Sequence, residues 1–300
     1  MFGQCENLEI RGRANKILKF VELQNTKRNN MCKIQFRNED CLKTIETIKK
    51  ANKKIDLVLT SPPYNGSRNN KKKNEKSRET HNDRYDVYED NKTNEEYYEW
   101  ILSIINGCEE ILSENGVILW NQSYSSENPM VLWELINEIH TKTKFMIADV
   151  IVWKKGSALP NNVGNKLTRI WEPVFVLCRK DEYKTFKTNK EVTSVSKTGQ
   201  KYYANVFNFF EAPNNDKSTN LNKATFSSDM VLQLLKIYAK PNSVIYDPFM
   251  GTGTTGIGVE KYGNGCICIG SEISPAQVEY SNNRLKEYRE KNGQTLNFED

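Results

Sequence analysis

The sequence predicts a doubly wound α/β sheet, and three observations support this fold class. Short apolar runs typical of buried strands alternate with amphipathic stretches of helical period. One such run ends at Thr60-Ser61-Pro62-Pro63-Tyr64, and another ends at Asp247-Pro248-Phe249-Met250-Gly251. In an open α/β sheet, ligands bind beyond the carboxyl ends of the strands. We therefore expect the two motifs to form opposite sides of one cleft.

The composition excludes several classes of protein. Of 300 residues, 37% are hydrophobic and 27% are charged, as in ordinary globular proteins. No run of about 18 apolar residues is present for a membrane span. The first residues lack the basic-then-apolar order of a signal peptide. We therefore expect a cytoplasmic protein with no membrane partner. The net charge of +5 is mildly basic and does not identify a partner by itself.

The cysteines and histidines argue against a disulfide framework and against a metal site. Seven cysteines lie at scattered positions, which favours reduced thiols. Cys266 and Cys268 alternate with isoleucines and suit a buried strand better than a metal site, because two further ligands are missing nearby. The two histidines are His81, in a charged segment, and His140, at the end of a helical stretch. A histidine-based catalytic triad or a zinc site is therefore not expected.

The first half of the chain begins with an extension and then a βαβ unit. Residues 1–30 show little periodicity and are expected to form the extension. The unit that follows consists of a strand at 33–36, an acidic turn at 38–41, a helix at 42–48 and a strand at 55–59. Pro62 and Pro63 have no backbone N–H and a fixed φ, so the last strand must stop there. By itself the proline pair is equally compatible with a rigid turn of no functional consequence.

The next elements continue the alternation. Residues 66–92 form a long polar segment with a basic cluster, which is expected either to be a solvated charge run or to bind a polyanion. A helix capped by Thr93 or Asn94 is expected to end at Asn115-Gly116. The remaining elements of this half are a strand at 117–120, a helix at 131–139, and strands at 149–153 and 173–177.

Residues 179–221 interrupt this pattern and have the character of an insertion. Lysines are interleaved with aromatic residues such as Tyr183, Tyr202 and Phe207. Basic side chains meet phosphates and flat rings meet bases, so the mixture favours a nucleic-acid contact. The alternative is a basic surface loop without a partner.

The last third of the chain predicts a nucleoside site. A helix capped at Ser227 or Ser228 leads to a strand at 244–246, after which glycines at 251, 253 and 256 precede another helix. A second strand, at 266–270, ends near Glu272, about twenty residues beyond the first glycine, where a carboxylate can accept both ribose hydroxyls. Ser274 and Pro275 begin the following helix.

The residue before the glycines bears on which nucleoside binds. In dinucleotide sites the glycines cradle a pyrophosphate, and a carboxylate at Asp247 would repel that group. It would instead attract an ammonium group. Asp247 and Glu272 together therefore favour S-adenosylmethionine, which carries an ammonium, a sulfonium and a ribose, over a nicotinamide dinucleotide.

Taken together, the motifs resemble those of the exocyclic-amino DNA methyltransferases, in the permuted order called the beta class. Residues 60–64 look like the catalytic motif of that family, and residues 247–255 look like its cofactor motif. The resemblance covers residues 33–286, and it implies a circularly permuted, Rossmann-like sheet of the S-adenosylmethionine-dependent methyltransferases. Residues 223–227 depart from it, because they lack the His and Pro common at that place.

The resemblance also implies roles for individual residues. The catalytic residues would be Ser61, Pro62, Pro63 and Tyr64. The residues that hold S-adenosylmethionine would be Asp40, Asp247, Pro248, Phe249, Gly251, Gly253, Thr254 and Glu272. The residues that contact DNA would be Arg68, Lys71, Lys72, Lys73, Trp153, Lys154 and Arg169. No metal is expected.

The reaction implied is methyl transfer to the exocyclic amino group of a flipped base, with S-adenosylhomocysteine as the product. Ser61 as the first residue of the catalytic motif favours cytosine N4 over adenine N6, since members with Asp there are mostly adenine enzymes. More remote alternatives are an RNA methyltransferase and a catalytically silent nucleic-acid-binding regulator. The partner would be double-stranded DNA in the cytoplasm, with a cognate restriction endonuclease elsewhere. The protein would be a monomer or a homodimer.

The expected domain organisation follows from these assignments. Residues 1–30 are the extension, 31–178 the catalytic half with its basic loop 66–92, and 179–221 a target-recognition insert. The cofactor-binding half covers 222–290, and 291–300 form a tail.

Overall fold

The computed structural model describes residues 31–65, 92–124, 128–216 and 225–293. The expectations for the extension 1–30, for most of the basic loop 66–92, including Arg68 and Lys71 to Lys73, and for the end of the tail lie outside these residues. In the part of the chain that is described, no helix is long and apolar enough to cross a membrane.

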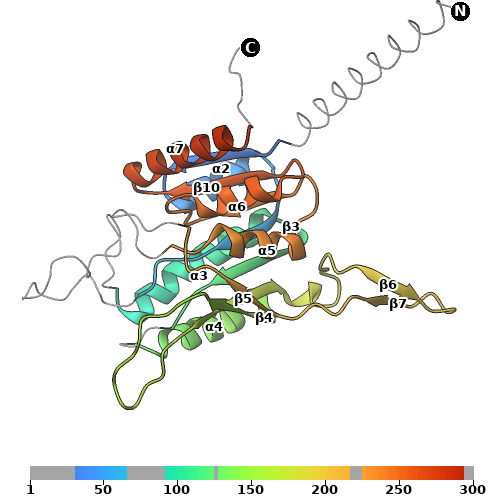
Figure 1. Cartoon of the computed structure of the whole chain (residues 1–300), viewed down its shortest axis with the longest axis horizontal. Helices are drawn as coiled ribbons and strands as arrows, with labels where there is room; N and C mark the ends of the chain where they lie inside the picture. Colours follow the sequence, from blue (N-terminus) through green and yellow to red (C-terminus); the bar gives the residue numbers. More distant parts are fainter. Residues whose placement is uncertain (1–30, 66–91, 125–127, 217–224, 294–300) are drawn as a thin grey trace, which may run out of the picture.

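A central sheet of eight strands organises the molecule (Figure 1). Its spatial order is β1-β10-β9-β2-β3-β5-β4-β8. The bounds are β1 (Lys33–Asn38), β2 (Ile55–Thr60), β3 (Leu112–Asn121), β4 (Phe145–Lys155), β5 (Trp171–Arg179), β8 (Phe209–Ala212), β9 (Val244–Asp247) and β10 (Ile267–Glu272). Strand β5 is antiparallel to both β3 and β4, whereas the other neighbours are parallel. The predicted alternation of strands and helices is confirmed.

The two motif-bearing strands, β2 and β9, are direct neighbours at the centre of this sheet. Leu57 pairs with Ile245 and Val58 with Tyr246, in parallel register. Both strands therefore end at the same edge of the sheet, although their sequences lie far apart in the chain. From β9 the chain continues outward to β10, whereas from β2 it continues in the opposite direction to β3. This reversal is the position at which open α/β sheets bind ligands.

Helices cover both faces of the sheet, as a doubly wound fold requires. One face carries α2 (Cys41–Lys50), α3 (Asn94–Ile111) and α4 (Val131–Lys142), and their apolar side chains form one core cluster. The opposite face carries α5 (Ser228–Tyr238) and α6 (Thr254–Tyr262), which contribute to a second cluster. Helix α7 (Pro275–Lys291) contacts α6 and β1. The predicted caps at Thr93, Ser227 and Ser274 are present, each accepting a bond from a backbone N–H three residues on.

The segment expected as an insert takes part in the main sheet. After the short helix η1 (Lys180–Glu182), strands β6 (Val192–Val195) and β7 (Lys201–Tyr203) form a two-stranded hairpin. Figure 1 shows this hairpin extending away from the sheet and helices. Strand β8 then pairs in parallel with β4, at the edge of the central sheet. The described part of this segment, residues 179–216, is therefore part surface hairpin and part sheet edge.

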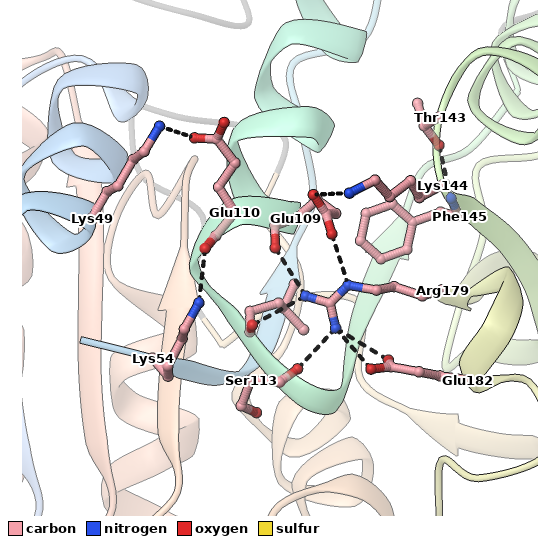
Figure 2. Close-up of polar contacts among 11 residues, drawn as sticks. Lys49, Lys54, Glu109, Glu110, Ser113, Thr143, Lys144, Phe145, Arg179 and Glu182 are labelled. Carbon is pink, nitrogen blue, oxygen red and sulfur yellow. Dashed lines mark hydrogen bonds and ion pairs between the residues drawn. The ribbon is translucent and has the colours of Figure 1, made fainter. Parts of the chain in front are cut away.

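One predicted boundary is wrong, because α3 ends at Ile111 and not at Asn115-Gly116. The guanidinium of Arg179 donates to the backbone carbonyls of Glu109, Leu112 and Ser113 at 2.9, 3.0 and 2.9 Å (Figure 2). Glu109 lies in the last turn of α3, so the bond to its carbonyl satisfies one of the groups that a helix end leaves without a partner, whereas the other two bonds hold the first residues of β3. Asn115, at φ 58°, instead lies within β3, where the pairing with β2 shifts its register.

Candidate functional site

A cavity lies at the carboxyl edge of the sheet, between the ends of β2 and β9. Together with the open solvent at its mouth, this space is about 890 Å³. The loop after β2 lines it with all four residues of the catalytic motif, Ser61 to Tyr64. The loop after β9 lines it with Pro248, Phe249, Gly251 and Thr254 among others. The two motifs thus lie on one cavity, as expected from the sequence.

The Pro-Pro loop is fixed from behind by buried polar groups. The hydroxyl of Tyr97 donates to the carbonyl oxygen of Pro63 at 3.0 Å, and the amide of Gln122 donates to that hydroxyl at 3.0 Å. The indole of Trp120 in turn donates to Gln122 at 2.9 Å. Because Tyr97, Gln122 and Trp120 are all buried, breaking this chain would leave polar atoms without water to replace their partners. The loop is therefore held rigidly at the rim of the cavity.

Ser61 and Tyr64 face the same cavity and lie close to each other. Their hydroxyl oxygens are 3.3 Å apart, a long contact in which either oxygen can be the donor. Replacing this long contact by a hydrogen bond to a ligand would therefore cost little free energy. Both side chains are half-buried, so a flat group that enters the cavity can reach them.

Asp247 does not face the cavity. Its side chain is fully buried, and its carboxylate accepts bonds from the Thr60 hydroxyl at 2.6 Å, from the Phe249 amide at 3.0 Å and from the Thr255 hydroxyl. The carboxylate is turned inward, where it joins the two motif loops, and its expected contact with an ammonium group stays a prediction. Burial raises the pKa of this carboxyl from 3.8 to about 6, although the three hydrogen bonds oppose that rise.

The loop after β9 owes its shape to glycine at two positions. Gly251 and Gly253 have φ of 53° and 78°, in the left-handed region that favours glycine. Gly253 also lies against α7, because a Cβ there would come within 2.8 Å of the Ser281 side chain. Gly253 is not a cavity-lining residue, so its role is to shape the loop and bring α7 close.

Three carboxylates line the cavity on the side of β1 and β10, those of Glu39, Asp40 and Glu272. Glu39 accepts from the Thr44 hydroxyl at 2.8 Å and pairs with Arg37. Glu272, at the end of β10, accepts from the backbone amides of Gly251 at 3.1 Å and Ser274 at 2.9 Å, which ties the glycine loop to the next strand. Asp40 caps α2 by accepting from the amide of Leu42 at 2.8 Å. Carboxylate oxygens are hydrogen-bond acceptors, which suits these side chains to the hydroxyl or amino groups of a nucleoside.

The cavity has further walls that the sequence reasoning missed. Trp100 of α3 lines it, as do Met250 of the glycine loop, Gln277 of α7, and Thr225 and Phe226 before α5. The periodicity of α3 marks only its sheet-facing residues, such as Ile101 and Ile104, and Trp100 lies beside that stripe. The one signal in the sequence that could have identified Trp100 was an aromatic residue next to the apolar stripe of a predicted helix.

The predicted DNA-contacting residues that the structure describes, Trp153, Lys154 and Arg169, lie in three different surroundings. Trp153 is 1% exposed and donates its indole N–H to the carbonyl of Ala212 at 3.2 Å, so the expected DNA contact is corrected to a core position joining β4 to β8. Lys154 forms an ion pair with Glu211 at 2.6 Å. Arg169 lies over the ring of Tyr124, 4.8 Å from its centroid, and donates to the Tyr124 carbonyl.

The fold and cavity define a Rossmann-like methyltransferase, and two solved structures share this fold. The PvuII DNA methyltransferase, described as cytosine-N4-specific, has a TM-score of 0.61 at 17% identity, over 89% of this chain and 88% of that chain. The complex of M1.HpyAVI with S-adenosylmethionine has a TM-score of 0.55 at 20% identity, over 84% of this chain and 98% of that chain. At these identities the similarity concerns the fold alone.

The family follows from the sequence comparison. The family model for DNA methylases of the N6 and N4 type matches residues 55–283, and the chain belongs to this family. It is similar to the type II methyltransferase M.HinfI of Haemophilus influenzae, at 24% identity over 83% of this chain and 67% of that protein. It is also similar to the type II methyltransferase M.BglII of Bacillus subtilis, at 26% identity over 80% of this chain and 70% of that protein.

S-adenosylmethionine is the cofactor of a methyltransferase of this family, and the residues present fit it. The cavity is lined by the carboxylates of Asp40 and Glu272, whose oxygens are acceptors of the kind that bind the hydroxyl and amino groups of a nucleoside. The aromatic rings of Trp100 and Phe249 supply apolar walls for flat or sulfonium groups.

Proposed function

We propose that this protein is a type II DNA methyltransferase that methylates the exocyclic amino group of a base flipped out of double-stranded DNA, with cytosine N4 as the target. The single observation that supports it best is the placement of Ser61 and Tyr64 on the same cavity as the glycine loop, within a DNA methylase chain. Methyl donor and acceptor amine would then meet in one enclosed space.

The chain's own residues would position the amine. Ser61 Oγ and the Pro62 carbonyl oxygen would each accept a hydrogen bond from one N–H of the amino group. These bonds would turn the lone pair of the amino nitrogen away from the ring. Tyr64 would stack on the base, and the rigid Pro-Pro loop would hold these groups in place during transfer. When bound, S-adenosylmethionine supplies an electrophilic methyl group on a sulfonium.

The residues that would hold the cofactor are those around the glycine loop. Glu272 would accept hydrogen bonds from the ribose hydroxyls, and Asp40 would accept one from the adenine amino group. The wall of the cavity around them would be formed by Pro248, Phe249, Gly251 and Thr254. Asp247 and Gly253 would act from behind that wall by fixing the loop.

The target base is inferred from Ser61, since a serine hydroxyl is a weaker acceptor than the aspartate typical of adenine enzymes. Adenine N6 is the second candidate, because the rest of the cavity does not select between the two amines. A catalytically silent regulator and an RNA methyltransferase are remote candidates. The intact catalytic and cofactor motifs argue against the regulator.

We also propose a function for each segment of the chain. Residues 31–178 would form the catalytic half, with the loop 66–92 on DNA, and 222–290 the cofactor half, in the permuted order of the beta class. Residues 179–221 would recognise the target, supported by half-exposed Tyr202 and Tyr203 on the projecting hairpin. A cognate endonuclease and a monomeric or homodimeric state complete the proposal.

The decisive experiment is to incubate the protein with isotopically labelled S-adenosylmethionine and genomic DNA, then to identify the modified nucleoside by mass spectrometry. Labelled N4-methylcytosine is the expected product. Labelled N6-methyladenine would reassign the target, and label in RNA but not in DNA would replace the substrate. Binding of DNA without any transfer, at several cofactor concentrations, would favour the regulator.

A further inference from the structure

The wall of the cavity formed by α3 consists of one aromatic residue, Trp100. Its ring lies 5.5 Å from that of Phe249, centroid to centroid, at an interplanar angle of 62°, which is an edge-to-face pair. Both residues line the cavity. Phe249 belongs to the glycine-loop motif, whereas Trp100 lies outside every motif found in the sequence.

Trp100 is itself held in place by its neighbours. The ring of Tyr97, one turn earlier on α3, lies 6.1 Å away, and the ammonium of Lys92 lies 5.9 Å from the centre of the indole. The backbone carbonyl of Lys92 accepts a hydrogen bond from the side-chain amide of Asn65 at 3.0 Å, so the segment before α3 is tied to the residue that follows Tyr64. Trp100 is thus placed by the same helix turn and the same loop end that place the catalytic motif.

We infer that Trp100 is a positioning residue for the cofactor, which sets the affinity for S-adenosylmethionine by holding the Phe249 ring against the bound nucleoside. The inference rests on the proposed function in so far as this cavity is the cofactor site. Edge-to-face pairs of aromatic rings contribute about 0.5–1.5 kcal/mol beyond the area they bury. Without the indole, the Phe249 ring would lose its support on the side of α3 and the cavity would widen.

The chain offers a matched control in Trp133. This residue also forms an edge-to-face pair, with Phe175 at 6.3 Å and 88°, but it lies on α4 and does not line the cavity. Trp133→Leu removes an indole and its pair with Phe175. Trp100→Leu likewise removes an indole and its pair with Phe249, together with the contacts of that indole with Tyr97 and Lys92. Only the replacement on α3 is expected to change cofactor binding.

The test measures binding of S-adenosylhomocysteine by calorimetry and steady-state methylation for the wild type, Trp100→Leu and Trp133→Leu. For Trp100→Leu, we expect the Kd to rise about 10-fold. The KM for S-adenosylmethionine should rise in parallel, while kcat at saturating cofactor and the KM for DNA stay within about twofold of wild type. A Kd within twofold of wild type would overturn the inference. So would an equal rise in Trp133→Leu, or a fall in kcat with unchanged Kd.

A double-variant cycle with Phe249→Leu tests the route of the effect. If Trp100 acts through Phe249, the double variant should bind more tightly than the product of the two single effects implies. Strictly multiplicative effects would show that the two rings act independently and would refute the positioning role. If the wild type itself fails to bind S-adenosylhomocysteine, the assignment of the cavity fails, which is a separate result from a normal Kd in Trp100→Leu.

Discussion

The hydroxyl of Thr60 donates a hydrogen bond to the buried carboxylate of Asp247 at 2.6 Å. Thr60 is the last residue of β2 and precedes Ser61, and Asp247 is the last residue of β9 and begins the glycine-loop motif. The same carboxylate accepts from the Phe249 amide within that motif. One buried side chain therefore fixes the relative position of the two loops that line the cavity.

Replacing Thr60 by valine should uncouple these loops. Valine keeps the shape of the side chain but removes the hydroxyl, so Oδ1 of the buried Asp247 carboxylate keeps the Phe249 amide and loses the other of its two donors. We expect a loss of about 1.5–3 kcal/mol in the free energy of unfolding, measured by urea denaturation, and weaker binding of S-adenosylhomocysteine. Thr60→Ser retains the hydroxyl and is the control. Equal stability of the valine variant and the wild type would remove this role.

Asp247→Asn should change how stability depends on pH. The folded-state pKa of about 6 lies above the ordinary value of 3.8, so the folded protein binds this proton more tightly than the unfolded chain. The stability from this group is therefore complete below pH 3.8 and is lost as the pH rises through about 6. Asparagine has no charge to bury and lacks this dependence.

The measurement for Asp247→Asn is thermal or urea unfolding between pH 4 and pH 7. The free energy of unfolding of the wild type relative to the variant should fall by about 3 kcal/mol over this range. A difference that does not change with pH would show that the carboxyl titrates normally despite its burial.

Ser61→Ala and Tyr64→Ala should separate chemistry from cofactor binding. In the proposed mechanism Ser61 accepts from the amine and Tyr64 stacks on the base, so kcat should fall by about 100-fold, as when one stabilising hydrogen bond is lost from an active site. The Kd for S-adenosylhomocysteine should stay near that of wild type. Ser113→Ala removes a serine hydroxyl that bonds to Asp56, away from the cavity, and should leave kcat unchanged. Methyl transfer at the wild-type rate by either variant would refute its catalytic assignment.

Tyr97→Phe should loosen the Pro-Pro loop without touching the cofactor. The variant loses the bond to the Pro63 carbonyl and leaves Gln122 short of a partner. We expect kcat to fall about 10-fold with an unchanged Kd for S-adenosylhomocysteine, since only the geometry of the catalytic loop is relaxed.

The neighbouring Tyr98 provides the control, because its hydroxyl bonds to Glu134 away from the loop. Tyr98→Phe removes one tyrosine hydroxyl from the same helix and should keep wild-type kcat. Parallel losses of activity in the two variants would indicate a general effect on α3 and not on the loop.

The sequence by itself determined the features that depend on local chemistry. Pro62 and Pro63 end a strand wherever they occur, glycines 251 and 253 permit left-handed backbone, and Thr93, Ser227 and Ser274 cap helices through bonds only three residues long. The alternation of apolar runs and amphipathic stretches predicted the doubly wound sheet for the same reason. The two motifs were readable because each is a short, contiguous segment.

Only the tertiary structure decided what depends on contacts between distant segments. Asp247 turns inward because the pairing of β2 with β9 brings it to Thr60, 187 residues away in the chain. Trp153 is buried beside β8, where its indole bonds to Ala212, and Arg179 binds the Glu109 carbonyl at the end of α3 and the Leu112 carbonyl at the start of β3. Trp100 and Tyr97 join the site because α3 packs beside both loops. Side-chain direction and burial of this kind follow from long-range packing, which no local pattern encodes.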